Sequence, residues 1–116
     1  MNIVSFSGIC KKYGIRLHSF RAAEKYMKMV NLEPSKSSGY SVYQNNPIIL
    51  YDDERPIEEI RFTVAHELGH ILLGHLNYRQ KDGVIPEWAE QEANTFASVL
   101  IANEILKQCG KGDFTK

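Results

Sequence analysis

The segment His66-Glu67-Leu68-Gly69-His70 contains the residue types that bind and use a metal ion. Histidines four positions apart on a helix are separated by about 40° around its axis, so both imidazoles can reach one ion from the same face. Glu67 lies beside them and could take a proton from a metal-bound water, whose pKa zinc lowers to about 7. A chain of this composition would contain the pattern by chance roughly once in a hundred cases. The alternative interpretation is that both histidines only pack in the core.

A catalytic zinc site normally has three protein ligands and a water, so a third ligand must come from elsewhere in the chain. His75 is one candidate. It lies about 140° further around the helix than His70, so it could turn inward only if the helix breaks at Gly74.

A later helix offers a better source in Glu87, Glu90 and Glu92. Glu90 lies at the edge of a small-residue stripe that would face the motif helix, and we expect it to be the third ligand. Glu92 lies about 200° away, so it is expected to face water. Glu87 is confined to the first turn, and the alternative for Glu90 is a solvated helix charge. The stripe consists of Ala89, Ala93, Ala97 and Ile101.

Three other side chains could support such a site. Asn94 shares the face of Glu90, so its amide could hold a ligand histidine from behind and fix its tautomer. A plain polar surface role is the alternative for Asn94. His75 and Tyr78 are the nearest candidates in sequence for a second donor to the oxyanion of the reaction, although surface or packing roles are open to both.

Two amphipathic helices would position these residues. The motif lies in a segment whose apolar residues recur every three or four positions, which predicts a helix with Pro56 in its first turn, running towards Gly74. Pro86 opens a last helix, which is expected to end before Gly110 and to leave residues 110–116 as a frayed tail. The apolar positions of the first helix are Ile57, Ile60, Val64, Leu68 and Ile71.

The chain before the motif predicts short elements of both kinds. Residues 40–44 and 48–51 flank an Asn-Asn-Pro turn and predict a β-hairpin. Ahead of them we expect a helix over residues 3–13, a strand over 14–20, a helix over 21–32 stopped by Pro34, and a loop over 35–39. The predicted fold class is α+β, in which a β-hairpin or small antiparallel sheet packs on the motif helix and a C-terminal helix.

Length and composition indicate a single domain. The chain has 116 residues, of which 43% are apolar and 24% charged, as in ordinary globular domains. We expect one domain over residues 1–116, with a motif-bearing core at about 40–106. Fourteen basic and fourteen acidic residues give a formal net charge of +0, so the broad basic field of a nucleic-acid-binding protein is missing.

The two cysteines and the N-terminus indicate a cytoplasmic protein. Cys10 and Cys109 are interpreted as free thiols in a reducing compartment, with a disulfide between them as the alternative. The N-terminal residues have neither a basic leader nor a long apolar stretch, so we expect no signal peptide and no membrane contact. The sequence carries no signal for an oligomeric state.

The segments RFTVAHELGHILLGH (residues 61–75) and EQEANTFA (residues 90–97) resemble the paired motifs of the ImmA/IrrE family of zinc metallopeptidases. The similarity covers about residues 40–101. It implies a zincin-like core of the gluzincin type, in which His66, His70 and Glu90 bind zinc and Glu67 is the catalytic base. It also implies a bacterial or mobile-element setting and a helix-turn-helix repressor as the substrate.

The expected function is therefore zinc-dependent cleavage of one specific partner protein. The strand that leads into the motif helix is expected to expose its edge beside the zinc, where an extended peptide could add as a further strand. The main alternative is a regulatory module that binds and sequesters a repressor or an antitoxin without cutting it. A hydrolase acting on a small molecule is a third alternative.

Overall fold

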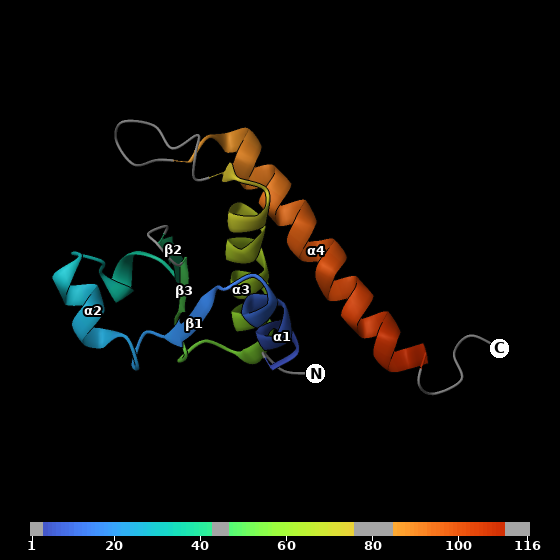
Figure 1. The fold of residues 1–116 in the computed structure, drawn as a ribbon, viewed down its shortest axis with the longest axis horizontal. Coiled ribbons are helices and arrows are strands. Elements are labelled where there is room, and N and C mark those ends of the chain that lie inside the picture. Colours follow the sequence, from blue (N-terminus) through green and yellow to red (C-terminus); the bar gives the residue numbers. More distant parts are fainter. Residues whose placement is uncertain (1–3, 43–46, 76–84, 111–116) are drawn as a thin grey trace.

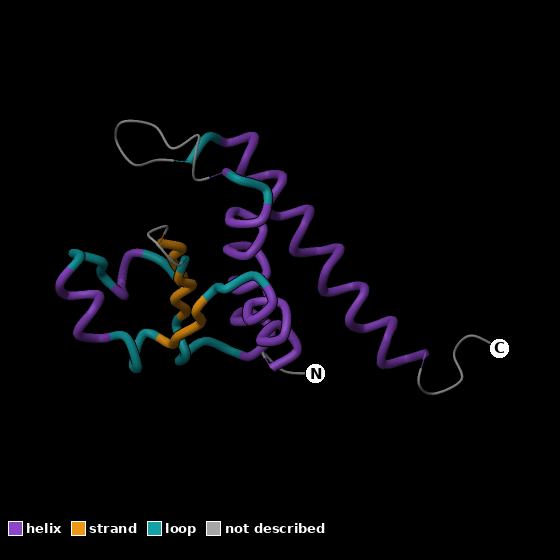
Figure 2. The backbone as a smooth tube through the Cα atoms, viewed as in Figure 1, coloured by secondary structure: helices purple, strands orange, loops and turns teal. Residues whose placement is uncertain are grey.

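The computed structural model describes residues 4–42, 47–75 and 85–110, which form an α+β fold (Figures 1 and 2). The fold consists of short elements followed by two longer helices. In chain order these are α1 (Val4–Lys12), β1 (Arg16–Ser19), α2 (Glu24–Met29), the 3₁₀ helix η1 (Pro34–Lys36), β2 (Gly39–Val42), β3 (Ile48–Tyr51), α3 (Ile57–Leu72) and α4 (Glu87–Gly110).

The three strands form one mixed sheet in the order β1-β3-β2. β2 and β3 pair antiparallel, with Tyr40 opposite Leu50, which confirms the predicted hairpin. β1 joins the other side of β3 in parallel, with Leu17 opposite Ile49, a pairing that the sequence analysis did not predict. The strand leading into the motif helix was expected to expose its edge, and this was wrong, because β3 is the central strand. On the hairpin side of β3, the outer edge of the sheet is formed by β2.

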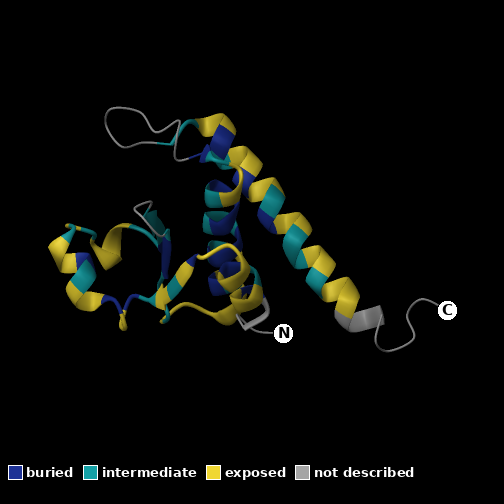
Figure 3. Cartoon of the chain, in the orientation of Figure 1, coloured by how far each residue is buried: buried dark blue, intermediate teal, exposed yellow. Residues whose placement is uncertain are grey.

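Two apolar clusters cover the two faces of the sheet. The strands and the facing sides of the helices α3 and α4 contain buried residues (Figure 3). Neighbouring side chains of a strand point to opposite faces, so Ile49 enters one cluster while Ile48 and Leu50 enter the other. The larger cluster joins α1, α3 and α4 to the sheet, and the smaller one packs α2 against it. The larger cluster contains Phe6, Cys10, Ile15, Ile49, Ile60, Val64, Ala65, Leu68 and Ala97.

The helix α2 is shorter than predicted at both ends. It ends at Met29, ahead of Pro34, because Asn31 adopts a left-handed conformation with φ 61°. The N–H of Leu32 then donates to the carbonyl of Met27 at 2.9 Å and closes the helix end. Residues 21–23 form a turn instead of a helix.

The helix α4 runs through Gly110, whereas it was expected to end before that residue. The predicted tail from residue 111 onward lies outside the described residues, as does the side chain of Cys109. Cys10 is a free, buried cysteine, and burial raises the pKa of its thiol. None of the helices in the described part of the chain is long and apolar enough to cross a lipid bilayer.

The helices α3 and α4 cross closely because small residues line their contact. Ala89, Ala93 and Ala97 of α4 are fully buried, as the predicted stripe requires. On α3, Gly69 allows the ring of Phe96 to approach, since a Cβ at position 69 would lie only 3.0 Å from Phe96 Cδ1. Larger residues at these positions would push the two helices apart.

We expect Gly69→Ala to destabilise the protein. Overpacking costs about 1–3 kcal/mol, whereas alanine gains about 0.5–1 kcal/mol over glycine inside a helix. Gly8→Ala is the matched control, because position 8 is also helical but has nothing within 4 Å of an added Cβ. Urea unfolding should show a lower free energy of unfolding for Gly69→Ala and a higher one for Gly8→Ala. Equal stabilisation by both substitutions would mean that the two helices are not in close contact at Gly69.

Candidate metal centre

Three side chains from α3 and α4 converge on one point. His66 and His70 lie one turn apart on α3, and Glu90 comes from the first turn of α4. The Nε2 atoms of the two histidines are 3.0 Å apart. Oε1 of Glu90 lies 3.0 Å from Nε2 of His66 and 2.7 Å from Nε2 of His70. These three residues are the ones expected from the sequence to share a metal ion.

The hydrogen bonds behind the two histidines show that this cluster fits a cation. The Nδ1–H of His66 donates to the amide oxygen of Asn94 at 2.8 Å, so Nε2 of the neutral ring carries the lone pair. Nδ1 of His70 is likewise in a hydrogen bond, with His75 at 3.0 Å. With both rings neutral and their Nδ1 hydrogens directed away from the cluster, two nitrogen lone pairs and a carboxylate oxygen face one another, an arrangement that a bound cation would stabilise.

The spacing of the three donor atoms also suits a divalent metal ion. In a tetrahedral zinc site with Zn–N near 2.05 Å, neighbouring donor atoms lie about 3.3 Å apart. The separations of 2.7–3.0 Å require only a small outward movement of the donors to reach that value. Burial lowers the pKa of His70, and the nearby His66 lowers it further, against the opposing effect of Glu90. A lowered pKa favours the neutral imidazole, which is the form that binds a metal.

Asn94 is positioned one turn after Glu90 on α4, where the sequence analysis expected it. Its amide oxygen lies on the Nδ1 side of His66, which is the position required to hold that ring from behind.

His75 is not placed as a third ligand or as a donor to the reaction centre. The helix α3 ends at Leu72, and Gly74 has a φ of 73°, the left-handed conformation that turns the chain inward. His75 is thereby buried behind His70, with a relative exposure of 1%. Both its ring nitrogens are engaged, Nδ1 with His70 and Nε2 with Glu92, so neither is available to an oxyanion. Tyr78, the other candidate donor, lies outside the described residues.

Glu92 faces water as expected, but it also makes a contact that was not expected. It was expected only to face water, and its side chain is indeed 58% exposed, but its carboxylate accepts a hydrogen bond from Nε2–H of His75 at 2.8 Å. His75 follows the end of α3 and meets Glu92, whereas His66 and His70 meet Glu90, so two sides of α4 contact the motif region. The signal that could have found this contact is a histidine directly after a glycine at the end of the motif helix.

A cleft of about 280 Å³ opens beside the three donors. Glu67 lines it together with His66 and Glu90, so a carboxylate that is not a ligand faces the same space. The approach from the sheet is formed by residues just before β2, where Ser38 Oγ lies 3.3 Å from Thr63 Oγ1. The full lining is Ser37, Ser38, Phe62, Thr63, His66, Glu67, Glu90 and Asn94.

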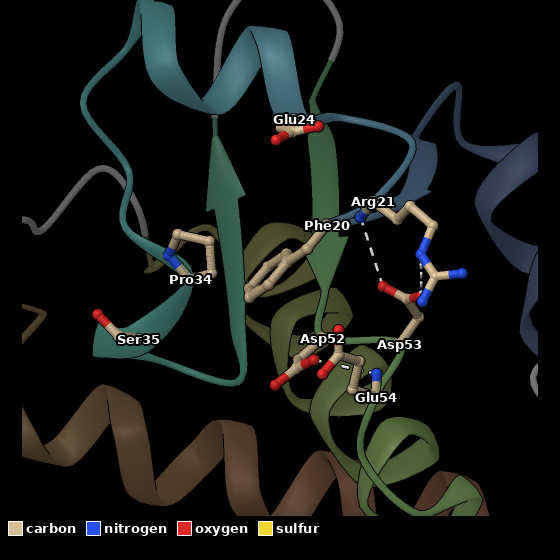
Figure 4. A pocket seen from close by; sticks show the side chains of 8 residues that line it. All are labelled: Phe20, Arg21, Glu24, Pro34, Ser35, Asp52, Asp53 and Glu54. Atoms are coloured by element: carbon tan, nitrogen blue, oxygen red, sulfur yellow. Dashed lines mark hydrogen bonds and ion pairs between the residues drawn. The ribbon is translucent and has the colours of Figure 1, made fainter.

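A larger depression of about 440 Å³ lies between α2, η1 and the turn after β3 (Figure 4). Arg21, Asp52 and Asp53 among its charged groups are already engaged. Arg21 forms an ion pair with Asp53 at 3.5 Å, and the N–H of Glu54 donates to Asp52 at 3.0 Å. None of the described residues that line it carries an imidazole or a thiol. The chemistry therefore points to the smaller cleft.

We expect the protein to bind about one divalent metal ion per chain. Glu90→Gln and His66→Ala should each lose most of this metal, because each removes one of the three converging donors. Glu87→Gln removes a charge from the same turn of α4 but not from the donor set, and it should keep the metal. Elemental analysis after dialysis measures the content. Equal metal in the wild type and in His66→Ala would exclude this site.

Comparison with known proteins gives one match. Residues 10–109 match the family described as the IrrE N-terminal-like domain, Peptidase_M78. Among curated proteins and solved structures no significant match is found. The match covers most of the chain and includes both helices that carry the donor atoms. The chain therefore belongs to the IrrE N-terminal-like family, which is the ImmA/IrrE metallopeptidase family that its two motifs resemble.

Proposed function

We propose that this chain is a zinc-dependent endopeptidase that acts in the cytoplasm on one partner protein, a helix-turn-helix repressor. The observation that carries the proposal is the convergence of His66, His70 and Glu90 beside a cleft that Glu67 also lines. Two imidazoles and one carboxylate are a donor set found in catalytic zinc sites of peptidases, in which the fourth position holds water. Membership of a peptidase family supports the same activity.

In the proposed mechanism the three ligands hold the ion and Glu67 moves the proton. A zinc ion held by these ligands would act as a Lewis acid, which would polarise the scissile carbonyl and lower the pKa of a water molecule. Glu67 takes a proton from that water while the water oxygen attacks the carbonyl carbon. Glu67 then returns the proton to the leaving amine nitrogen as the C–N bond breaks. Asn94 keeps the Nε2 lone pair of His66 directed at the ion through its hydrogen bond to Nδ1.

The edge of β2 is the proposed binding site for the substrate backbone. Ser37 and Ser38 line the cleft and lead directly into β2, which is an outer strand of the sheet. The N–H of Asp52 donates to the carbonyl of Ser38, so the backbone polar groups of Ser38 point towards β3. Along an antiparallel ladder this direction alternates, so the backbone N–H and C=O of Tyr40 point towards β3. Those of Ser41 point away from β3, to the outer edge of the sheet. An extended peptide could pair with the outward groups of Ser41 and pass beside the donors.

The choice of a repressor as substrate rests on the family resemblance and on the size of the cleft. A cleft of about 280 Å³ cannot enclose many side chains, so selection must depend on docking elsewhere on the partner. A formal net charge of +0 means that the protein can reach a repressor without binding DNA itself.

We expect Glu67→Gln to abolish cleavage and to leave metal binding intact, because glutamine cannot take the proton from water. Purified helix-turn-helix repressors from the source genome are each incubated with wild type or variant and zinc, and fragments are identified by mass spectrometry. Fragments that persist with Glu67→Gln would indicate a contaminating protease. If both proteins only bind the repressor and leave it uncut, the function is sequestration and not proteolysis.

We expect Ser41→Pro to lower kcat/KM for the repressor by about tenfold, since it removes one outward N–H from the edge strand while keeping the pairing with β3. Ser41→Ala is the matched control, because it shortens the side chain and keeps the backbone N–H. Metal content should be unchanged in both variants. Equal kcat/KM for the two variants would exclude β2 as the strand to which the substrate adds.

A further inference from the structure

His75 and Glu92 form a hydrogen-bonded row with the ligand His70, on the side of its ring away from the donor atoms. Nδ1 of His70 lies 3.0 Å from Nδ1 of His75, and Nε2 of His75 lies 2.8 Å from Oε1 of Glu92. The row therefore begins at Nε2 of His70, among the three donor atoms, and passes through the imidazole rings of His70 and His75. It ends at the carboxylate of Glu92 on the exposed side of α4. His70 and His75 are both buried, whereas the Glu92 side chain is 58% exposed.

The direction of each hydrogen bond in this row follows from the carboxylate at its end. An ionised carboxylate only accepts, so Nε2 of His75 must carry a hydrogen and donate it to Glu92. A neutral imidazole has one N–H, and Nδ1 of His75 is then an acceptor. Nδ1 of His70 must therefore donate to it, which leaves the lone pair of His70 on Nε2, the atom that faces His66 and Glu90.

The ring of His75 is held in place by packing as well as by hydrogen bonds. Its edge meets the face of Trp88, with ring centroids 5.6 Å apart and planes at 87°. On its other side it meets the ring of His70, with centroids 5.2 Å apart and planes at 70°. The left-handed Gly74 brings the chain into this position immediately before His75. A ring fixed in this way has little freedom to offer a different nitrogen to His70.

We propose that Glu92 and His75 are positioning residues that fix the tautomer of His70 and strengthen its Nε2 as a metal ligand. This inference rests on the metal site of the proposed function. Outer groups of this kind orient a ligating ring and raise its basicity, and their loss typically lowers metal affinity by about 10–100-fold. The two histidine ligands then have unlike supports: a neutral amide, Asn94, behind His66, and a carboxylate relayed through His75 behind His70.

Zinc affinity in the presence of a competing chelator tests the pair. We expect the dissociation constant to rise about 10–100-fold in His75→Leu, which removes the acceptor for Nδ1–H of His70. His75→Asn should recover part of that loss, because its side-chain oxygen can lie near the position of the lost Nδ1. Glu92→Gln should weaken binding less than His75→Leu, since its amide oxygen still accepts from His75 but the negative charge is gone.

Glu87→Gln is the matched control for the loss of charge. Glu87 is an exposed glutamate of the same helix, and its substitution should leave the zinc affinity unchanged. His75 is buried, so His75→Leu requires a check of folding by circular dichroism. The exposed Glu92 supplies a variant that folds even if His75→Leu does not. Wild-type affinity in both Glu92→Gln and a folded His75→Leu would overturn the inference; if His75→Leu does not fold, wild-type affinity in Glu92→Gln would do so.

The tautomers provide a second readout that a purely structural role would not produce. Two-bond ¹H–¹⁵N correlation spectra of the zinc-loaded wild type should show His70 with a hydrogen on Nδ1 and zinc on Nε2, and His75 with a hydrogen on Nε2 only. A hydrogen on Nδ1 of His75 would overturn the inference while leaving the metal site intact. A wild type that binds no zinc would overturn the metal site itself. Normal zinc binding and tautomers without cleavage would overturn only the peptidase activity.

Discussion

The close crossing of α3 and α4 is the constraint on which the site depends. His66 and His70 share a face of α3 by helical geometry alone, but Glu90 reaches them only because Ala89 and Ala93 allow the backbones to approach. A separation larger by the length of a methyl group would leave the carboxylate out of reach of both nitrogens. The apolar contact along these helices thus stabilises the fold and sets the donor distances at the same time.

Local patterns were enough to predict the helices and the hairpin. The three-and-four spacing from Ile57 to Ile71 identified α3, and the alanine stripe identified the buried face of α4. The parallel pairing of β1 with β3 could not be predicted, because strands of four residues carry little signal and their contact is distant in sequence. The early end of α2 depends on the left-handed backbone conformation of Asn31, which a content of helix-forming residues does not reveal.

The converging side chains could be identified from the sequence where one helix face was sufficient, whereas a contact was missed where the chain folds back. The spacing of His66 and His70, and the phase of Glu90, identified the residues that the structure brings together. The contact between Glu92 and His75 was missed because α4 was expected to have a single contact face. The turn at Gly74 gives α4 a second neighbour in His75, and that turn is a backbone property which no side-chain periodicity reveals.

The arrangement of the sheet limits the kind of substrate that such a site can take. Of the three described strands, β2 is the one whose edge lies next to the cleft, and it is four residues long. Pairing along so short an edge involves few backbone hydrogen bonds, each contributing about 0.5–1.5 kcal/mol. Recognition of a peptide by this edge alone would therefore be weak and insensitive to sequence. The proposed peptidase activity would therefore obtain its specificity from folded surfaces of the partner outside the cleft, and it would require that the cleaved segment be already extended and accessible.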